Sequence, residues 1–185
     1  MTKKVIVPVA NGSEELETIT IVNILRRAGI EVVIFSKEEI VSCARGIKLI
    51  ADINEISSIE TNEYHGIVIP GGILGVQNLS TDNQIVLLIK EFIRLNKLVG
   101  AICAAPSILA ERNLYPKDIK LTSHPSVKDK LQEYEYLDDA VVEYDNFITS
   151  RGAGTALDFS FAIVEYLLGE EVALKIKENI LYNID

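Results

Sequence analysis

The sequence predicts an α/β sandwich with a mostly parallel central sheet, and two observations support this. Short runs rich in β-branched residues alternate along the chain with longer amphipathic segments, an order typical of a sheet covered by helices. The runs are also nearly continuously apolar, as in Lys-Val-Ile-Val-Pro-Val-Ala at 4–10. A strand that is buried on both faces needs no alternation of polar and apolar residues, so these runs favour parallel strands.

Strands are expected where such a run is bounded by turn residues. The segment 41–51 is expected to form a strand pair that turns at Arg45-Gly46, and 141–144 with 147–150 a hairpin with the two-residue turn Asp145-Asn146. The other expected strands are 4–10, 31–36, 66–70, 98–103 and 120–123.

Helices are expected where apolar residues recur every three or four positions. In 14–28 the apolar positions are Leu16, Ile19, Val22 and Leu25, and Gly29 follows where a helix would end. The other expected helices are 82–96 with Asp82 as N-cap, 104–112 with Pro106 near its first turn, and 155–168 and 170–181 on either side of Gly169.

Length and charge limit the possible functions. The 185 residues fit one domain, 1–185. With 18 Lys and Arg against 27 Asp and Glu, the net charge of −9 argues against binding to nucleic acid or to an anionic membrane. No apolar stretch approaches the 18 residues of a membrane span and no secretory signal is recognisable, so a cytoplasmic protein is expected.

The only two cysteines, Cys43 and Cys103, suit neither a disulfide framework nor a zinc site.

In parallel sheets, ligands bind beyond the carboxyl ends of the strands. Three segments are expected to emerge at that edge: 10–13, 70–75 and 103–106. Cys103 lies there, at a sharp turn from a buried strand to a predicted helix, as a nucleophile would. The amides and dipole of a helix N-terminus would lower the pKa of its thiol. A structural cysteine at the end of a core strand would give the same sequence pattern.

Glu17 belongs to the first turn of the first helix, whose start faces the same edge. An ionised carboxylate beside Cys103 would oppose a thiolate, so a Glu17 that approaches the sulfur should be protonated and donate to it. The alternative is that Glu17, like Glu14 and Glu15, only complements the helix N-terminus; for Glu14 and Glu15 we prefer that explanation.

Backbone and basic groups complete the candidate site. The Gly72 N–H and the Ala104 N–H could form an oxyanion hole, although Gly-Gly turns are common for conformational reasons alone. His124 is a candidate base, against the alternative of a structural histidine, whereas His65 stands at the wrong end of a strand. The two arginines Arg45 and Arg151, in glycine-containing turns, could bind an anion or serve as ion-pair partners.

Together these motifs resemble the ThiJ/PfpI superfamily, in particular the branch of the parkinsonism-associated protein deglycase. The motifs, in order, are 11–18 (Asn-Gly-Ser-Glu-Glu-Leu-Glu-Thr), 26–29, 69–72, 101–106 (Ala-Ile-Cys-Ala-Ala-Pro), 123–125 and 149–152. The resemblance implies a flavodoxin-like three-layer sandwich and a homodimer. It also implies that Cys103 is the nucleophile and oxidation-sensitive thiol, Glu17 its protonated partner and His124 an acid or base. Gly72 and Ala104 would supply amides, and Arg45 and Arg151 an anion-binding rim.

The resemblance further implies an enzyme of the glyoxalase or protein deglycase type, a hydro-lyase or hydrolase that uses a nucleophilic cysteine. It would act on small dicarbonyls, converting methylglyoxal to lactate, or on glycated protein, and would need no metal, nucleotide or flavin cofactor. The alternative is an oxidative-stress sensor or chaperone that is regulated by oxidation of Cys103. Ala104 stands where the peptidase-like branch has histidine, and Ile50 stands where some relatives carry a second redox cysteine.

Overall fold

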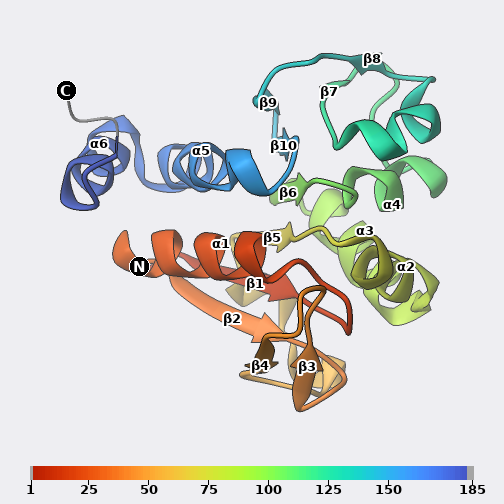
Figure 1. Ribbon diagram of the computed structural model, residues 1–185, viewed down its shortest axis with the longest axis horizontal. Coiled ribbons are helices and arrows are strands. Elements are labelled where there is room, and N and C mark those ends of the chain that lie inside the picture. The colour runs from red at the N-terminus through yellow and green to blue at the C-terminus, as the bar shows by residue number, and fades with distance from the viewer. Residues whose placement is uncertain (1, 183–185) are drawn as a thin grey trace.

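The computed structural model describes residues 2–182 and confirms the flavodoxin-like α/β sandwich (Figure 1). Its central sheet has six strands in the order β2-β1-β5-β6-β10-β9. All neighbouring pairs are parallel except β10 and β9, which form the predicted antiparallel hairpin at one edge. The strands are β1 (Lys4–Pro8), β2 (Glu31–Phe35), β5 (Gly66–Ile69), β6 (Leu98–Ile102), β9 (Val141–Tyr144) and β10 (Phe147–Ser150).

Helices cover both faces of this sheet (Figure 1). One layer contains α1 (Glu15–Arg27), α5 (Ala156–Leu168) and α6 (Glu170–Asn179), and the other contains α2 (Ile73–Thr81), α3 (Asn83–Arg94) and α4 (Pro106–Glu111). Each layer encloses its own apolar core. Phe159 and Ile163 are fully buried in the first, and Phe92 and Ile89 in the second. Among residues 2–182, no helix is both long enough and apolar enough to span a bilayer.

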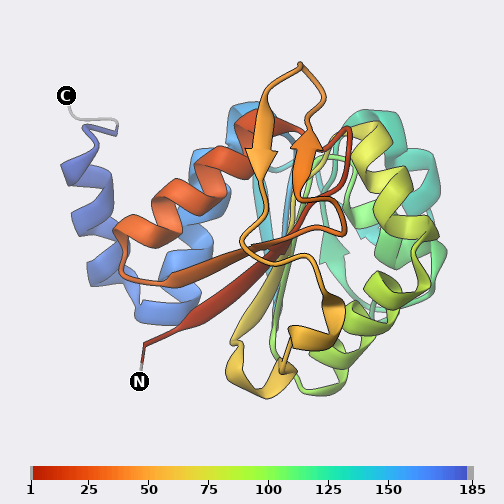
Figure 2. The same ribbon diagram turned by 90° about the horizontal axis from the view of Figure 1, so that it is seen from below.

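Smaller elements lie outside the main sheet. The predicted strand pair is the ribbon of β3 (Ile40–Ser42) and β4 (Lys48–Ile50), which projects beyond the sandwich (Figure 2). A second ribbon pairs β7 (Lys120–Leu121) with β8 (Glu135–Tyr136). The 3-10 helices are η1 (Ile56–Ser58), η2 (Thr61–Glu63), η3 (Pro125–Leu131) and η4 (Ala153–Thr155).

The structure corrects the predicted elements in two places that bear on the site. Helix α2 occupies 73–81, for which no helix was expected, because buried Val76 and Leu79 stabilise a segment of weak helix formers. Helix α4 begins at Pro106 rather than at 104 and has only six residues. Cys103 therefore lies in a turn before the helix and not at its first residue.

Candidate active site

Cys103 directly follows β6 and has an unusual backbone conformation. Its φ of 62° lies in the left-handed region, which a residue with a side chain seldom adopts. Two hydrogen bonds hold it there: its N–H donates to the Ser150 carbonyl (2.9 Å), and its own carbonyl accepts the N–H of His124 (2.8 Å). Such a conformation costs about 1–3 kcal/mol and is found where it serves a site. The thiol itself is half-buried.

Glu17 approaches this thiol from the first turn of α1. The residue is fully buried, and its Oε2 accepts the N–H of Gly71 at 2.7 Å. Its other oxygen, Oε1, has no backbone or hydroxyl partner in the described part of the chain. A buried carboxylate oxygen without a donor is costly, so this oxygen is the one on which a proton is favoured.

Gly71 allows these two side chains to meet. A Cβ atom at residue 71 would lie 2.5 Å from the Cys103 Cβ and 2.7 Å from the Glu17 Oε2. Both distances are well inside van der Waals contact, so only glycine fits between the acid and the cysteine. Glycine at position 71 is therefore a physical requirement of the site.

Burial dominates the titration of both groups. It raises the pKa of Glu17 to about 7, although hydrogen bonds from Gly71 and Cys103 act in the opposite direction. Burial also raises the pKa of Cys103 to about 12, with a further contribution from the charge of an ionised Glu17. The lowering expected from a helix N-terminus is thus wrong, because the sulfur is buried beside an acid and the short α4 begins three residues later. A charged sulfur here requires a neutral Glu17.

The two predicted amide donors face the sulfur. The N–H groups of Gly72 and Ala104 lie close to the Cys103 side chain and lower the pKa of its thiol. Gly72 has a φ of 88°, and a Cβ there would lie 2.3 Å from the Gly12 carbonyl oxygen. Its N–H can therefore point at the sulfur only because residue 72 is glycine.

His124 lies beside Cys103 and caps η3. Its Nδ1 is 2.8 Å from the Ser126 Oγ and also accepts the Ser126 N–H at 3.2 Å. A Cβ placed on Gly152 would be 3.6 Å from the His124 Cδ2 and 4.0 Å from the Cys103 Sγ. Gly152 thus separates the imidazole from the thiol, and its missing side chain leaves that space open.

These groups line a cavity of about 660 Å³, within the usual size range of ligand sites. Arg45 also lines it, from the exposed turn between β3 and β4. So does buried Cys43, for which the sequence suggested no role in the site. The residues lining the cavity are Asn11, Gly12, Glu14, Glu17, Ser42, Cys43, Ala44, Arg45, Gly72, Ile73, Leu74, Cys103, His124, Ser126 and Ala153.

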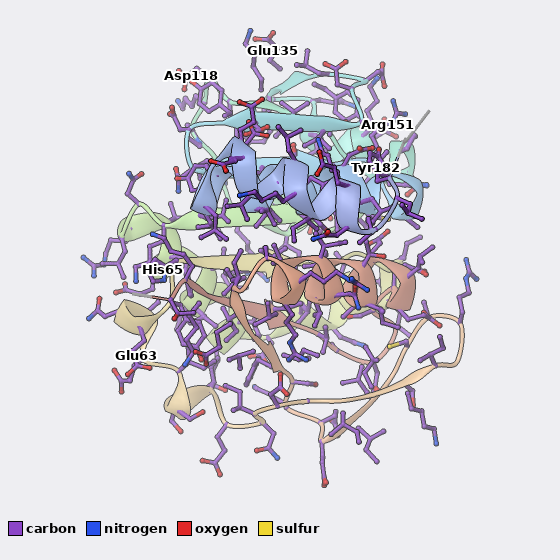
Figure 3. All side chains as sticks on the ribbon, turned by 90° about the vertical axis from the view of Figure 1, so that its left-hand side faces the viewer. Glu63, His65, Asp118, Glu135, Arg151 and Tyr182 are labelled. Carbon is purple, nitrogen blue, oxygen red and sulfur yellow. The ribbon has the colours of Figure 1, made fainter. Side chains whose placement is uncertain are left out.

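The structure does not bring Arg151 to this cavity. Its Nη1 donates to the Asp138 carbonyl (2.8 Å) and to the Asp138 carboxylate (3.2 Å), so its charge is already paired. His65 accepts the Lys4 N–H near the start of β1, and Figure 3 shows it far from Arg151. Residues 2–182 hold no cluster of three His, Cys, Asp or Glu side chains that could bind a metal.

Comparison with known proteins shows the family of the chain. Residues 3–166 match the model of the DJ-1/PfpI family. The chain belongs to the DJ-1/PfpI family. The superfamily resemblance predicted from the motifs is thereby confirmed, since the match covers every motif on which it rested.

Individual members of the DJ-1/PfpI family are similar over most of the chain. The Drosophila melanogaster DJ-1beta crystal structure superposes with a TM-score of 0.94 at 34% identity and covers 100% of both chains. The Caenorhabditis elegans protein named glutathione-independent glyoxalase DJR-1.2 is 38% identical over 162 residues, 86% of this chain and 85% of the relative. Arabidopsis thaliana DJ-1 homolog B is 37% identical over 180 residues, 96% of this chain but only 41% of the relative, so the chain spans less than half of that protein.

Proposed function

We propose that the protein is a cofactor-independent cysteine enzyme that converts reactive dicarbonyls to hydroxy acids, with methylglyoxal giving lactate. The main observation behind the proposal is the surroundings of the Cys103 thiol, which lines a cavity. The thiol lies next to Glu17, an acid that can be protonated, and next to two backbone N–H groups. The name of the Caenorhabditis elegans relative, a glutathione-independent glyoxalase, supports the same reaction class.

In the first step, the Cys103 sulfur adds to the aldehyde carbon of methylglyoxal and forms a hemithioacetal. The aldehyde oxygen becomes an alkoxide, which the Gly72 and Ala104 amides would stabilise. Glu17 is protonated while the sulfur is charged, since both groups cannot be ionised together at this depth.

In the second step, a proton leaves the former aldehyde carbon and another is delivered to the neighbouring carbon. His124 or Glu17 would carry this proton; for His124 the atom is Nε2, since Ser126 occupies Nδ1. The product is a thioester on Cys103, and water hydrolyses it to lactate and the free thiol. Overall, one water is added and no electrons are exchanged with a cofactor. The same addition at Cys103 would allow action on early glycation adducts of protein.

The test is conversion of methylglyoxal to lactate by purified protein without added cofactor. The Cys103→Ser variant should lose at least about a thousandfold in turnover, because removal of a covalent nucleophile is that costly. Circular dichroism checks that the variant is folded. Equal lactate formation by the wild type and Cys103→Ser would refute a nucleophilic role for this cysteine.

A second candidate function rests on the same donors. The Gly72 and Ala104 amides and a protonated Glu17 could hold the two oxygens of a Cys103 sulfinate, as in a peroxide sensor. Mild peroxide should then add two oxygens to Cys103, measured by mass spectrometry. That mass gain in a wild-type protein without dicarbonyl turnover would favour the sensor over the enzyme.

A further inference from the structure

A second buried acid lies two residues before Glu17 and has no part in the chemistry above. Glu15 is only 4% exposed, although it carries a carboxylate at the start of α1. Its two oxygens accept the Arg45 N–H at 2.9 and 3.0 Å, and Oε1 also accepts the Ile47 N–H at 3.4 Å. Burial raises the pKa of Glu15, but hydrogen bonds from backbone N–H groups outweigh it and lower the pKa. The carboxylate is therefore charged at neutral pH.

These bonds fasten the turn between β3 and β4 to the body of the protein. The two strands have only three residues each and project beyond the sandwich (Figure 2). A two-stranded ribbon of this size is marginal by itself. Apart from Glu15, the turn is tied to the neighbouring loop by the Ala44 N–H, which donates to the Ser13 carbonyl at 2.9 Å. Two bonds of Ser42, at the end of β3, hold the base of the turn to the same loop.

The turn that Glu15 fastens forms one wall of the Cys103 cavity. Cys43, Ala44 and Arg45 line the cavity from this side, and Arg45 is the one arginine or lysine among the residues that line it. The opposite wall, with Cys103 and His124, is built on the ends of the main sheet and does not contact Glu15 through any of these bonds. Loss of the Glu15 carboxylate should therefore move the substrate-binding wall and leave the cysteine in place.

We propose that Glu15 is a positioning residue for substrate binding: by holding the Arg45 and Ile47 amides, it fixes the wall that carries Arg45 and Cys43. This inference rests on the proposed dicarbonyl reaction for its kinetic consequence. It assigns Glu15 an effect on KM and none on the reactivity of the Cys103 sulfur.

The kinetic test compares Glu15→Gln with Asp82→Asn. Asp82 also accepts a backbone N–H, that of Gln84 at 2.9 Å, but at the start of α3 and away from the cavity. Glu15→Gln should raise the KM for methylglyoxal about tenfold, as loss of a charged acceptor allows, with kcat within about twofold of the wild type. Asp82→Asn should change neither constant, and Arg45→Ala should reproduce the rise in KM. A fall in kcat without a rise in KM would overturn the proposal.

A second measurement does not depend on turnover. In a Cys103→Ser background, Cys43 is the remaining thiol, and it is only 7% exposed. Glu15→Gln should speed its alkylation by iodoacetamide about tenfold by freeing the turn, whereas Asp82→Asn and Arg45→Ala should not. If Glu15→Gln does not fold, Glu15→Asp takes its place with the same expectation. If Cys43 is alkylated no faster in Glu15→Gln than in the Asp82→Asn control, the role of Glu15 is refuted. Absence of turnover in the wild type refutes only the proposed reaction.

Discussion

At the scale of single residues, the site depends on one proton shared between two buried groups. Glu17 has a pKa raised to about 7 and Cys103 one raised to about 12, and each is raised further by a charge on the other or on nearby acids. Between these two pKa values the pair carries one negative charge. The Gly72 and Ala104 amides favour that charge on sulfur, whereas on Glu17 only Oε2 has a donor, the Gly71 N–H, and Oε1 has none.

Replacement of Glu17 by Ala tests this distribution of charge. Without the carboxylic acid, the sulfur loses a hydrogen-bond donor and must release its own proton from a buried position, so the pKa of the Cys103 thiol should rise. The expected result is that the alkylation rate of Cys103, measured from pH 5 to pH 11, reaches its midpoint at higher pH than in the wild type.

The opposite shift would contradict this account. A midpoint that moves to lower pH would mean that Glu17 acts mainly as a negative charge, and an unchanged midpoint would remove Glu17 from the site altogether. Glu171→Gln provides the control, since Glu171 is an exposed residue of α6 that pairs with Lys175.

At the scale of elements, α1 serves both walls of the cavity. Successive helical residues are 100° apart, so Glu15 and Glu17 point to nearly opposite sides of the helix. One therefore reaches the turn after β3, and the other reaches Gly71 at the end of β5. Leu16, between them, is 56% exposed. A shift of this one helix would disturb the acid and the substrate-binding wall together.

The end of β5 is equally constrained, and Gly71→Ala tests it. The new methyl group would lie 2.5 Å from the Cys103 Cβ and 2.7 Å from the Glu17 Oε2. Overpacking of this kind costs about 1–3 kcal/mol, and it should separate the acid from the thiol. We expect loss of dicarbonyl turnover and a lowered melting temperature. Gly154→Ala, with no atom within 4 Å of the added Cβ, should keep both, and a fully active Gly71→Ala would contradict the packing argument.

The elements that the sequence predicted well are those with strong periodicity or continuous burial. The strands of the sheet and the helices α1, α3, α5 and α6 fall within a few residues of their predicted limits. Helix α2 was not predicted, because its residues favour a helix only once Val76 and Leu79 pack against the core. The 3-10 helix η3 was also missed, since Val127 and Leu131 are its only buried residues and two positions are too few to establish a helical repeat.

At the scale of the whole molecule, the sheet topology explains why the candidate site could be predicted in part. Strand ends of a parallel sheet meet at one edge, so Cys103, Gly72 and Glu17 could be placed together from sequence. The pairing of Arg151 with Asp138 could not, since it depends on the path of the loop between η3 and β9. Nor could the role of Glu15, because its partners are backbone amides of a turn 30 residues away.

The surface also supports the homodimer that the family resemblance implied. Exposed apolar side chains occur on α1 and on the β3–β4 ribbon: Leu16, Ile19, Ile40, Ile47 and Ile50. Beside them a groove of about 440 Å³ runs between α1 and β4, lined in part by Val22 and Leu49. Monomers seldom expose so many neighbouring apolar groups, and such a surface fits a second copy of the chain.

We therefore propose that two chains associate through α1 and the β3–β4 ribbon, and that a charge introduced on this ribbon separates them. Ile50, 71% exposed on β4, can be replaced by Glu without disturbing the core. Analytical ultracentrifugation should show a dimer for the wild type and a monomer for Ile50→Glu, because a charge buried in an interface without a partner is costly. Leu87→Glu, at a 62% exposed position on α3 in the other helix layer, should remain dimeric. A monomeric wild type, or a dimeric Ile50→Glu, would rule out this face as the contact between chains.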